Sequence, residues 1–139
     1  VHLKGLTKLG ILNLYDTKVT DAGLVHLKGL TNLQSLELYG TEVTDAGLEH
    51  LKGLTNLRVL GLLNTQTGDS GLVHLKNLAN LRLLTLGTKV TDAGLVHLMG
   101  MTKLEELYFS SPKVTGAGIK TLQKFLPGCL IRNYPAPSQ

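Results

Sequence analysis

Residues 19–42 read VTDAGLVHLKGLTNLQSLELYGTE, and the chain repeats this stretch with few changes. TDAGLVHL occurs at 20–27 and again at 91–98, TDAGLEHL occurs at 44–51, and GDSGLVHL occurs at 68–75. Successive repeats place the glycine of this segment 24, 24, 23 and 24 residues apart, at Gly23, Gly47, Gly71, Gly94 and Gly118. A fixed period of this length is typical of a solenoid in which each repeat forms one coil.

Each repeat carries two periodicities, one typical of a helix and one typical of a strand. Leu24 and Leu27 lie three residues apart, which is the spacing of one helix face. Leu36 and Leu38 lie two residues apart, which is the spacing of one strand face. We therefore predict one strand and one short helix in each repeat. The other repeats have equivalent strand residues at Leu12/Leu14, Leu60/Leu62, Leu84/Leu86 and Leu107/Phe109.

Polar residues and glycines mark the ends of the predicted helices. Thr20 and Asp21 precede one helix, where both residue types cap free N–H groups and Asp also complements the helix dipole. The Gly23 position is unusual, because glycine inside a helix costs about 1 kcal/mol relative to alanine. Either a side chain there would clash with a neighbouring coil, or the helix begins later. We expect the helices to end in a left-handed conformation at Gly5, Gly29, Gly53, Asn77 and Gly100.

The pattern LxxLxLxxT followed by VTDAGLxxLxxLxxL resembles the leucine-rich-repeat family. The repeat length of 23–24 residues and the segment T-D-x-G-L are similar to the cysteine-containing-like class of that family, and above all to its bacterial versions. The resemblance covers about residues 1–132. It implies an α/β fold, a right-handed solenoid with a parallel sheet on the concave side and short helices on the convex side. It also implies that the chain binds another protein.

We predict one leucine-rich-repeat domain over residues 1–133 and a flexible tail over residues 134–139. Residues 1–6 match only the second half of the helical segment, so the first repeat is truncated. The chain also begins without Met, and we interpret it as a piece of a longer protein. A C-terminal cap is expected over about residues 119–133, because terminal repeats need a modified outer face.

The composition excludes several classes of protein. Hydrophobic residues make up 42% of the 139 residues, which is too many for a disordered chain. Cys129 is the only cysteine, so no internal disulfide can form, and we expect it to point inward with Ile131 in the last strand. No apolar run reaches the roughly 18 residues that span a bilayer, and we predict no membrane partner. The net charge of +4 permits an acidic partner without requiring one.

The outward strand positions vary most from repeat to repeat, whereas the leucines barely change. Three rows of side chains are expected to cross the sheet, a row being the equivalent residues of successive repeats. The rows contain apolar and aromatic residues, and an exposed patch of such residues often marks a partner site. Strands also favour Val, Leu and Tyr for structural reasons. The predicted partner-binding residues are Ile11, Asn13, Tyr15, Ser35, Glu37, Tyr39, Val59, Leu63, Leu83, Thr85, Glu106 and Tyr108.

Two rows of basic residues lie on the predicted helices. Histidines could bind metal or sense pH, but no cysteine or carboxylate lies at ligand spacing, so we expect repeated surface residues and no metal. Lysines could attract nucleic acid, but they also complement helix dipoles, and we predict no nucleic-acid partner. The histidines are His2, His26, His50, His74 and His97. The lysines are Lys4, Lys28, Lys52 and Lys76.

Two further rows are expected to be structural. The aspartates could attract Ca²⁺, but capping of the helices explains them without an ion. The threonines are expected to bond backbone groups in the turns, and the turn at Pro112 should differ because proline has no N–H. The aspartates are Asp21, Asp45, Asp69 and Asp92, and the threonines are Thr17, Thr41, Thr65 and Thr88.

No motif of catalysis occurs in the sequence. G-x-S-x-G, a Walker-type loop and paired catalytic carboxylates are absent, and Cys129 has no histidine in its repeat. We therefore predict that the chain is not an enzyme and needs no cofactor. The predicted function is protein–protein interaction through the concave sheet.

A structural or self-assembling spacer segment of a larger protein is the alternative. The truncated first repeat leaves an uncapped, leucine-rich N-terminal end, which could pair with another chain. Sedimentation separates the two hypotheses. Self-association that depends on concentration favours the spacer, whereas a clean monomer favours the binding module.

Overall fold

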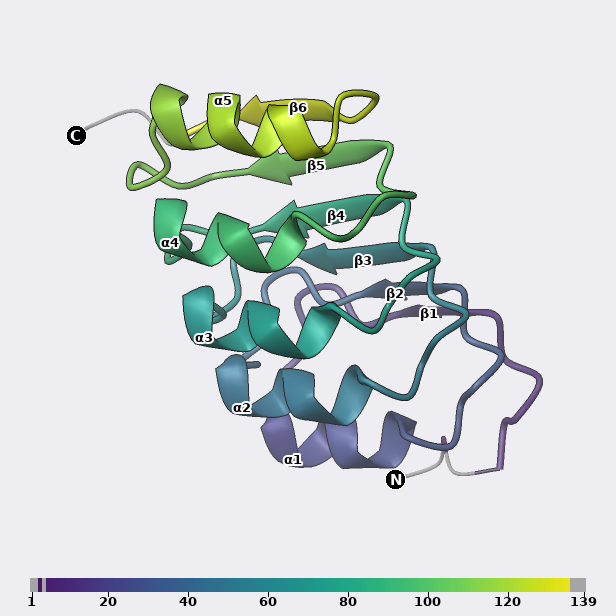
Figure 1. Ribbon diagram of the computed structural model, residues 1–139. Helices are drawn as coiled ribbons and strands as arrows, with labels where there is room; N and C mark the ends of the chain where they lie inside the picture. The colour runs from purple at the N-terminus through teal and green to yellow at the C-terminus, as the bar shows by residue number, and fades with distance from the viewer. Residues whose placement is uncertain (1–2, 4, 136–139) are drawn as a thin grey trace.

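In the computed structural model, each repeat forms one coil with a strand on one side and a helix on the other (Figure 1). The structure describes residue 3 and residues 5–135. Six parallel strands form one sheet in chain order, which confirms the predicted α/β architecture. The strands are β1 (Ile11–Asn13), β2 (Ser35–Glu37), β3 (Val59–Leu62), β4 (Leu83–Leu86), β5 (Glu106–Phe109) and β6 (Leu130–Asn133).

The helices of the first four complete repeats are short, as predicted. Each has four residues and continues into a 3-10 turn of three residues, and the last helix, α5 (Gly116–Phe125), has ten. Among the described residues, no helix combines the length and the apolar character needed to cross a bilayer. The short helices are α1 (Asp21–Leu24), α2 (Asp45–Leu48), α3 (Asp69–Leu72) and α4 (Asp92–Leu95). The 3-10 turns are η1 (Val25–Leu27), η2 (Glu49–Leu51), η3 (Val73–Leu75) and η4 (Val96–Leu98).

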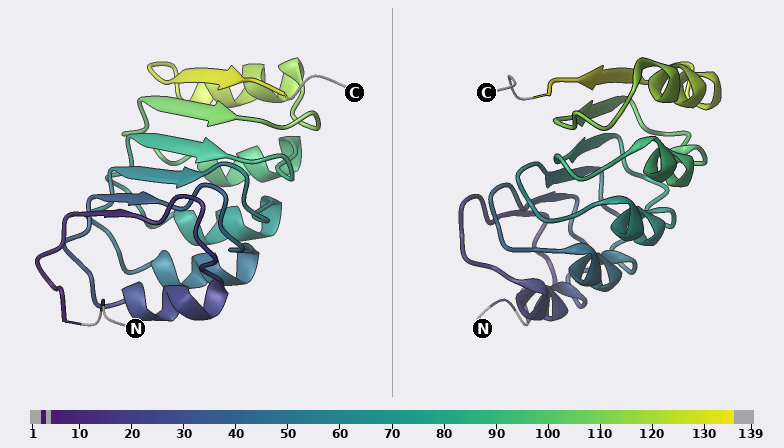
Figure 2. Two further views of the ribbon diagram at one scale, coloured as in Figure 1. Left: turned by 180° about the vertical axis from the view of Figure 1, so that it is seen from behind. Right: turned by 90° about the vertical axis from the view of Figure 1, so that its left-hand side faces the viewer.

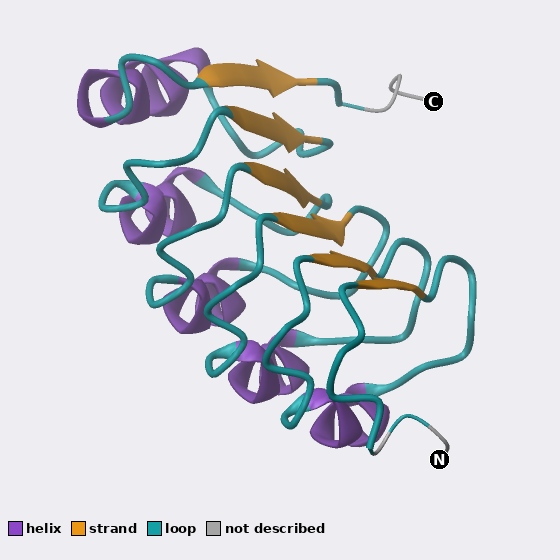
Figure 3. Cartoon of the chain, turned by 90° about the vertical axis from the view of Figure 1, so that its right-hand side faces the viewer, coloured by secondary structure: helices purple, strands orange, loops and turns teal. Residues whose placement is uncertain are grey.

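The strands form one layer and the helices a second layer (Figure 2). The stack of coils is curved, with the strands on its inner side and the helices on its outer side (Figure 3). Neighbouring strands lie about 4.8 Å apart, whereas packed helices need about 8–10 Å. A stack that joins the two layers coil by coil therefore bends toward the strands. The sheet thus forms the concave side, as the sequence predicts.

Leucines from successive coils fill the space between the two layers. Leu36 pairs with Leu60 and Leu60 with Leu84 in the sheet register, and each of these leucines is 0% exposed. Phe109 takes the place of leucine in β5 and is also buried. Cys129 lies in the core at 5% exposure, beside the buried Ile131, as expected from the sequence. The core is therefore one continuous ribbon, to which each coil adds an equivalent layer.

The aspartate row joins each coil to the next one. Oδ1 of Asp69 accepts a hydrogen bond from the N–H of Thr91 at 2.8 Å, and Oδ2 accepts one from the Thr91 hydroxyl at 2.5 Å. Oδ1 of Asp45 accepts from the N–H of Gly68 at 2.6 Å. The prediction that the aspartates cap their own helices is wrong, because their carboxylates bond the following coil. Equivalent bonds join Asp21 to Thr44 and Asp92 to Thr115.

Threonine hydroxyls supply the helix caps instead. The hydroxyl of Thr44 accepts a hydrogen bond from Ala46 N–H at 3.3 Å, and that of Thr91 accepts one from Ala93 N–H at 3.2 Å. Thr20 and Gly68 make no such bond with a side chain. The predicted capping by threonine is therefore present in some coils and missing in others.

The glycine inside each helix from α2 to α5 makes room for the aspartate of the preceding coil, whereas a Cβ at Gly23 in α1 would meet Val19 of its own coil at 3.2 Å. Gly71 lies within α3, so the alternative of a later helix start is wrong. A Cβ atom at Gly71 would lie 2.5 Å from Oδ1 of Asp45 and 2.8 Å from Cδ1 of Leu48. The clash with a neighbouring coil that the sequence suggests therefore explains the glycine. The same aspartate contact would occur at Gly47, Gly94 and Gly118.

Asparagines form a second ladder between coils, in the loops that lead into the strands. Each side-chain amide donates to a backbone carbonyl of the preceding coil, at 2.7–2.9 Å. These bonds satisfy carbonyl groups that the strands and helices leave free. The pairs are Asn32 with Thr7, Asn56 with Thr31, and Asn80 with Thr55.

The predicted left-handed helix ends are wrong at four of five positions. Gly5 has a φ of 108°, but Gly29, Gly53, Asn77 and Gly100 have no positive φ. The helices end through right-handed 3-10 turns instead, as where the N–H of Leu30 bonds the carbonyl of Leu27 at 2.9 Å. The left-handed residues follow the strands, at Asp16, Gly40 and Asn64 with φ of 51°, 69° and 55°.

One residue is missing from the turn of the fourth coil. The first three coils carry their left-handed residue two positions after the strand leucine. The fourth coil has no left-handed residue there, so Gly87 is buried and Thr88 is exposed. The single spacing of 23 residues between Gly71 and Gly94 therefore corresponds to this shortened turn.

Hydroxyl groups bond the backbone in the turns at three of the four threonines of the predicted row, and among the described residues the exposed Thr88 makes no such bond. The hydroxyls of Thr17, Thr41 and Thr65 each donate to the carbonyl three residues before, at 2.8 Å. The turn at Pro112 differs, as predicted: Pro112 is exposed, and the buried Ser111 hydroxyl donates to the carbonyl of Val90 at 2.5 Å.

The sheet pairing continues beyond the residue at which the predicted tail begins. The N–H of Tyr134 donates to the carbonyl of Phe109 at 2.9 Å, and the Ser110 hydroxyl donates to the carbonyl of Tyr134 at 3.2 Å. Tyr134 is therefore bonded to the fifth coil, in contrast to the predicted tail. Residues 136–139 of that tail lie outside the described residues.

We expect Gly71→Ala to lower the free energy of unfolding by about 1–3 kcal/mol, because its methyl group would displace Asp45 from its bond to Gly68. Gly53→Ala is the matched control, since a Cβ there meets nothing within 4 Å and φ is not positive. This control should be neutral or stabilise by about 0.4–1 kcal/mol. Urea unfolding measures both, and equal losses in the two variants would contradict the clash.

The bonds that Asp92 accepts from the side chain and N–H of Thr115 lower the pKa of Asp92 below 3.8. This carboxylate therefore contributes stability that is present at neutral pH, weakens as the pH falls toward 3.8, and is lost below the lowered pKa. Asp92→Asn should make thermal unfolding less dependent on pH between about 6 and about 2. An identical pH dependence in the two proteins would show that the contact with Thr115 is not coupled to folding.

Candidate functional site

The predicted partner-binding residues form three rows across the concave face of the sheet. In the first row Ser35 pairs with Ile11 and Val59, and in the second row Glu37 pairs with Asn13. The third row follows the strands and contains Tyr15, Tyr39 and Leu63. None of the twelve predicted residues is buried. The structure thus brings them together on one accessible surface, and their role in binding remains a prediction.

Tyrosines occupy both ends of this surface. Tyr15 and Tyr39 stack with ring centroids 4.5 Å apart and an angle of 5° between the rings. Tyr108 and Tyr134 lie 6.3 Å apart at 24°. These four are all the tyrosines of the chain. The pairing of β1 with β2 holds the Tyr15 and Tyr39 rings in equivalent positions, so this pair forms a flat aromatic surface. Tyr108 and Tyr134 belong to different rows, and their rings meet at an angle.

Side chains of the second row fold back onto the backbone of the third row. Oδ1 of Asn13 accepts a hydrogen bond from the N–H of Tyr15 at 2.9 Å, and Oε1 of Glu37 accepts one from the N–H of Tyr39 at 3.0 Å. The Glu37 carboxylate lies over Gly61, where any Cβ would overlap it. The bonds fix these polar groups at the backbone of the two tyrosines.

Negative charge lies close to the tyrosines. The hydroxyl of Tyr108 donates a hydrogen bond to Glu106, which raises the pKa of Tyr108 above 10.0. The charge of Asp16 is the largest cause of a raised pKa at Tyr15, followed by the partial burial of the ring. The protein carries a net charge of +4, so the local charge on this face differs in sign from that of the whole chain.

The last strand adds residues that the sequence analysis missed. β6 places Leu130 beside Glu106 and Arg132 beside Tyr108, and Tyr134 continues the third row. Leu130 is 41% exposed and Tyr134 is 62% exposed. The alternation of inward and outward residues along a strand could have predicted them. Leu130 lies between the inward Cys129 and Ile131, and Arg132 and Tyr134 follow at alternate positions.

The histidine and lysine rows lie on the opposite, convex side. His26, His50, His74 and His97 are half-buried, and Lys28, Lys52 and Lys76 are exposed. Lys52 lies 4.0 Å from Glu49 in an exposed ion pair. Within the part of the chain that the structure describes, no group of three or more metal-ligating side chains gathers. His2 and Lys4 lie outside the described residues.

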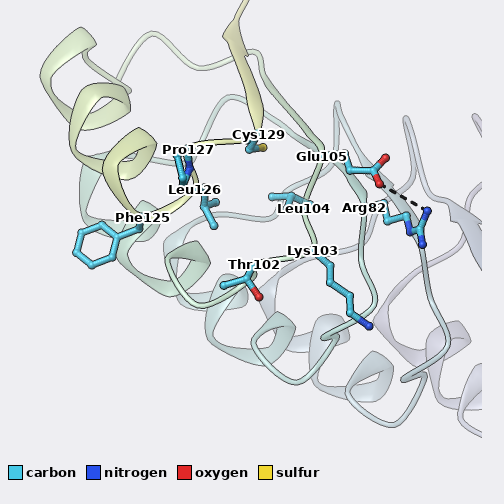
Figure 4. A pocket seen from close by; sticks show the side chains of 10 residues that line it. Arg82, Thr102, Lys103, Leu104, Glu105, Phe125, Leu126, Pro127 and Cys129 are labelled. Carbon is cyan, nitrogen blue, oxygen red and sulfur yellow. Dashed lines mark ion pairs between the residues drawn. The ribbon is translucent and has the colours of Figure 1, made fainter.

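A hollow of about 510 Å³ lies where the chain enters β5 and β6 (Figure 4). Phe125 and Pro127 line it from the cap, and Arg82 and Glu105 form an ion pair of 3.5 Å beside it. Cys129 also lines it, and burial raises the pKa of this thiol to about 11. The thiol is therefore protonated at neutral pH and is not an activated nucleophile.

Solved structures share this arrangement of coils. The chain superposes on an internalin C2 of Listeria monocytogenes with a TM-score of 0.72 and 24% identity, over 99% of this chain and 68% of that one. An internalin F of the same organism gives 0.64 and 22% identity, over 96% of this chain and 45% of that one. A leucine-rich-repeat protein of Leptospira interrogans gives 0.63 and 21% identity, over 91% and 38%.

The chain spans less than half of the second and third of these structures. No protein-family model matches the sequence, and no curated protein matches it. The likeness therefore lies in the architecture: parallel strands on one side, short helices on the other, and one coil per repeat.

Proposed function

Because this chain has the leucine-rich-repeat fold, we propose that it is a non-catalytic module that binds a protein partner through its concave sheet. Leucine-rich-repeat domains are typically protein-interaction modules, and their curved sheets offer an extended surface to a partner. Two of the compared structures come from one bacterium and the third from another, which supports the bacterial type of repeat that the sequence resembles.

The position of the tyrosines carries the proposal. All four lie on the concave face, although aromatic residues make up only 4% of the chain. Tyrosine is enriched at protein interfaces, because it combines a large apolar ring with a hydrogen-bonding group. Ile11 adds an apolar side chain that is 72% exposed on the same face. A bound partner would remove the tyrosine rings and the Ile11 side chain from water, which favours association.

Strand propensity alone would also place tyrosine, valine and leucine in a sheet. It would not make the outward rows vary while the inward leucines stay the same. Ile11, Ser35, Val59, Leu83, Glu106 and Leu130 share one row, whereas leucine or isoleucine fills every inward position between them and the second row. The variation is therefore confined to the surface that a partner can reach.

We expect alanine at both Tyr39 and Leu63 to weaken binding of the partner by at least about 2 kcal/mol, because the two are large, half-buried side chains in adjacent coils of the third row. The partner would first be isolated from the source organism on the immobilised wild-type chain, and its affinity for each variant then measured by calorimetry. Unchanged affinity would remove the concave face from consideration.

Alanine at both Val25 and Val96 is the matched control. These valines are 42% and 58% exposed on the convex side, so their removal also deletes exposed apolar surface. The control should leave the affinity unchanged. Loss of binding in the control alone would place the interface on the helices.

A further inference from the structure

Two carboxylates flank the stacked Tyr15 and Tyr39. The Asp16 carboxylate lies over Gly40, and the Glu37 carboxylate lies over Gly61, since a Cβ at either glycine would overlap the acidic group. Each acidic group therefore points along the sheet toward the next coil, at a position where that coil has no side chain. The glycine at position 61 leaves the room that the Glu37 carboxylate occupies.

Neither carboxylate has a cationic partner. Across residue 3 and residues 5–135, the ion pairs are Lys52 with Glu49 and Arg82 with Glu105, and neither lies on the concave face. Glu37 is half-buried, and its one hydrogen bond comes from the N–H of Tyr39. Its second oxygen receives no bond within that part of the chain. A half-buried carboxylate of this kind gains free energy from a cation supplied from outside.

The surroundings suit the side chain that would carry such a cation. The Glu37 carboxylate accepts the N–H of Tyr39, which lies two residues along the same face of the sheet. A cation over a tyrosine ring is attracted by its negative face. Val59 and Leu63, both half-buried, border the same region and can contact an aliphatic stem. The raised pKa of Tyr15, to which Asp16 and Glu37 both contribute, agrees with negative charge around the rings.

We propose that the protein partner inserts a basic side chain, arginine or lysine, against Glu37 and the stacked Tyr15–Tyr39 pair. This inference rests on the proposed function and specifies the chemistry of the partner at one end of the concave face. The guanidinium or ammonium group bonds the free oxygen of Glu37, and its stem lies along Tyr39. The lysine row lies on the convex side, and Arg132 lies at the other end of the concave face, beside Tyr108, so a basic segment is attracted to the end that carries Glu37 and Asp16.

A displayed library of random short peptides provides the probe. Selection on the immobilised wild-type chain should enrich peptides with arginine or lysine, and synthetic copies of these peptides would be measured by calorimetry. Glu37→Gln should weaken their binding by about 10-fold or more, because one charge-assisted bond is lost. Glu49→Gln, on the convex side, is the matched control and should leave affinity unchanged.

Glu37→Gln keeps an oxygen that can accept the Tyr39 N–H, so thermal unfolding should match that of the wild type. Asp16→Asn is a second, independent test of the contact with a basic side chain. It removes the charge and keeps the backbone, because asparagine readily adopts the left-handed conformation of residue 16. This variant should weaken binding about 2- to 5-fold, since Asp16 is exposed.

The outcomes separate this inference from the proposed function. Peptides without basic residues, insensitive to Glu37→Gln but lost on alanine at Tyr39 and Leu63, would overturn the basic contact and keep the concave face as the binding surface. Peptides insensitive to all of these changes would overturn both. Basic peptides that lose affinity equally in Glu37→Gln and Glu49→Gln would show nonspecific charge attraction and overturn the assigned site.

Discussion

Stacking of leucine layers is the interaction on which the rest of the structure depends. A single coil has a strand and a helix of four residues, and it cannot bury its own leucines. Leu60 reaches 0% exposure because Leu36 and Leu84 lie on either side of it. This stacking uses only the inward face of the sheet. The outward face takes no part in this packing, so its side chains can vary without loss of the core.

Polar contacts determine how closely and in which register the coils stack. The bond from Gly68 to Asp45 requires that the aspartate lie where a side chain at Gly71 would otherwise be. Hydrophobic packing is non-directional and would tolerate a small slide of one coil over the next. The aspartate bond is directional, and it fixes the start of one helix against the next coil. In the sheet, the pairing of β1 with β2 aligns Tyr15 with Tyr39 on the concave face.

Because the sequence repeats, its architecture was predictable. The predictions failed where a bond crosses from one coil to the next and where the chain departs from the repeat. The alternation of Leu36 and Leu38 predicted the strand, the buried face and the outward position of Glu37. The role of Asp45 was predicted wrongly, because sequence places it beside its own helix while the bond crosses to Gly68, 23 residues later. The outward position of Tyr134 was missed, since the cap no longer follows the repeat.

The shortened turn of the fourth coil divides the aromatic content of the concave face. Leu63 and the buried Gly87 separate the Tyr15–Tyr39 pair from Tyr108 and Tyr134. Under the proposed function, a long partner would contact two separate aromatic surfaces with a stretch that lacks aromatic side chains between them. Because these surfaces belong to different coils, a substitution in one leaves the other in place, and the specificity of each could evolve separately.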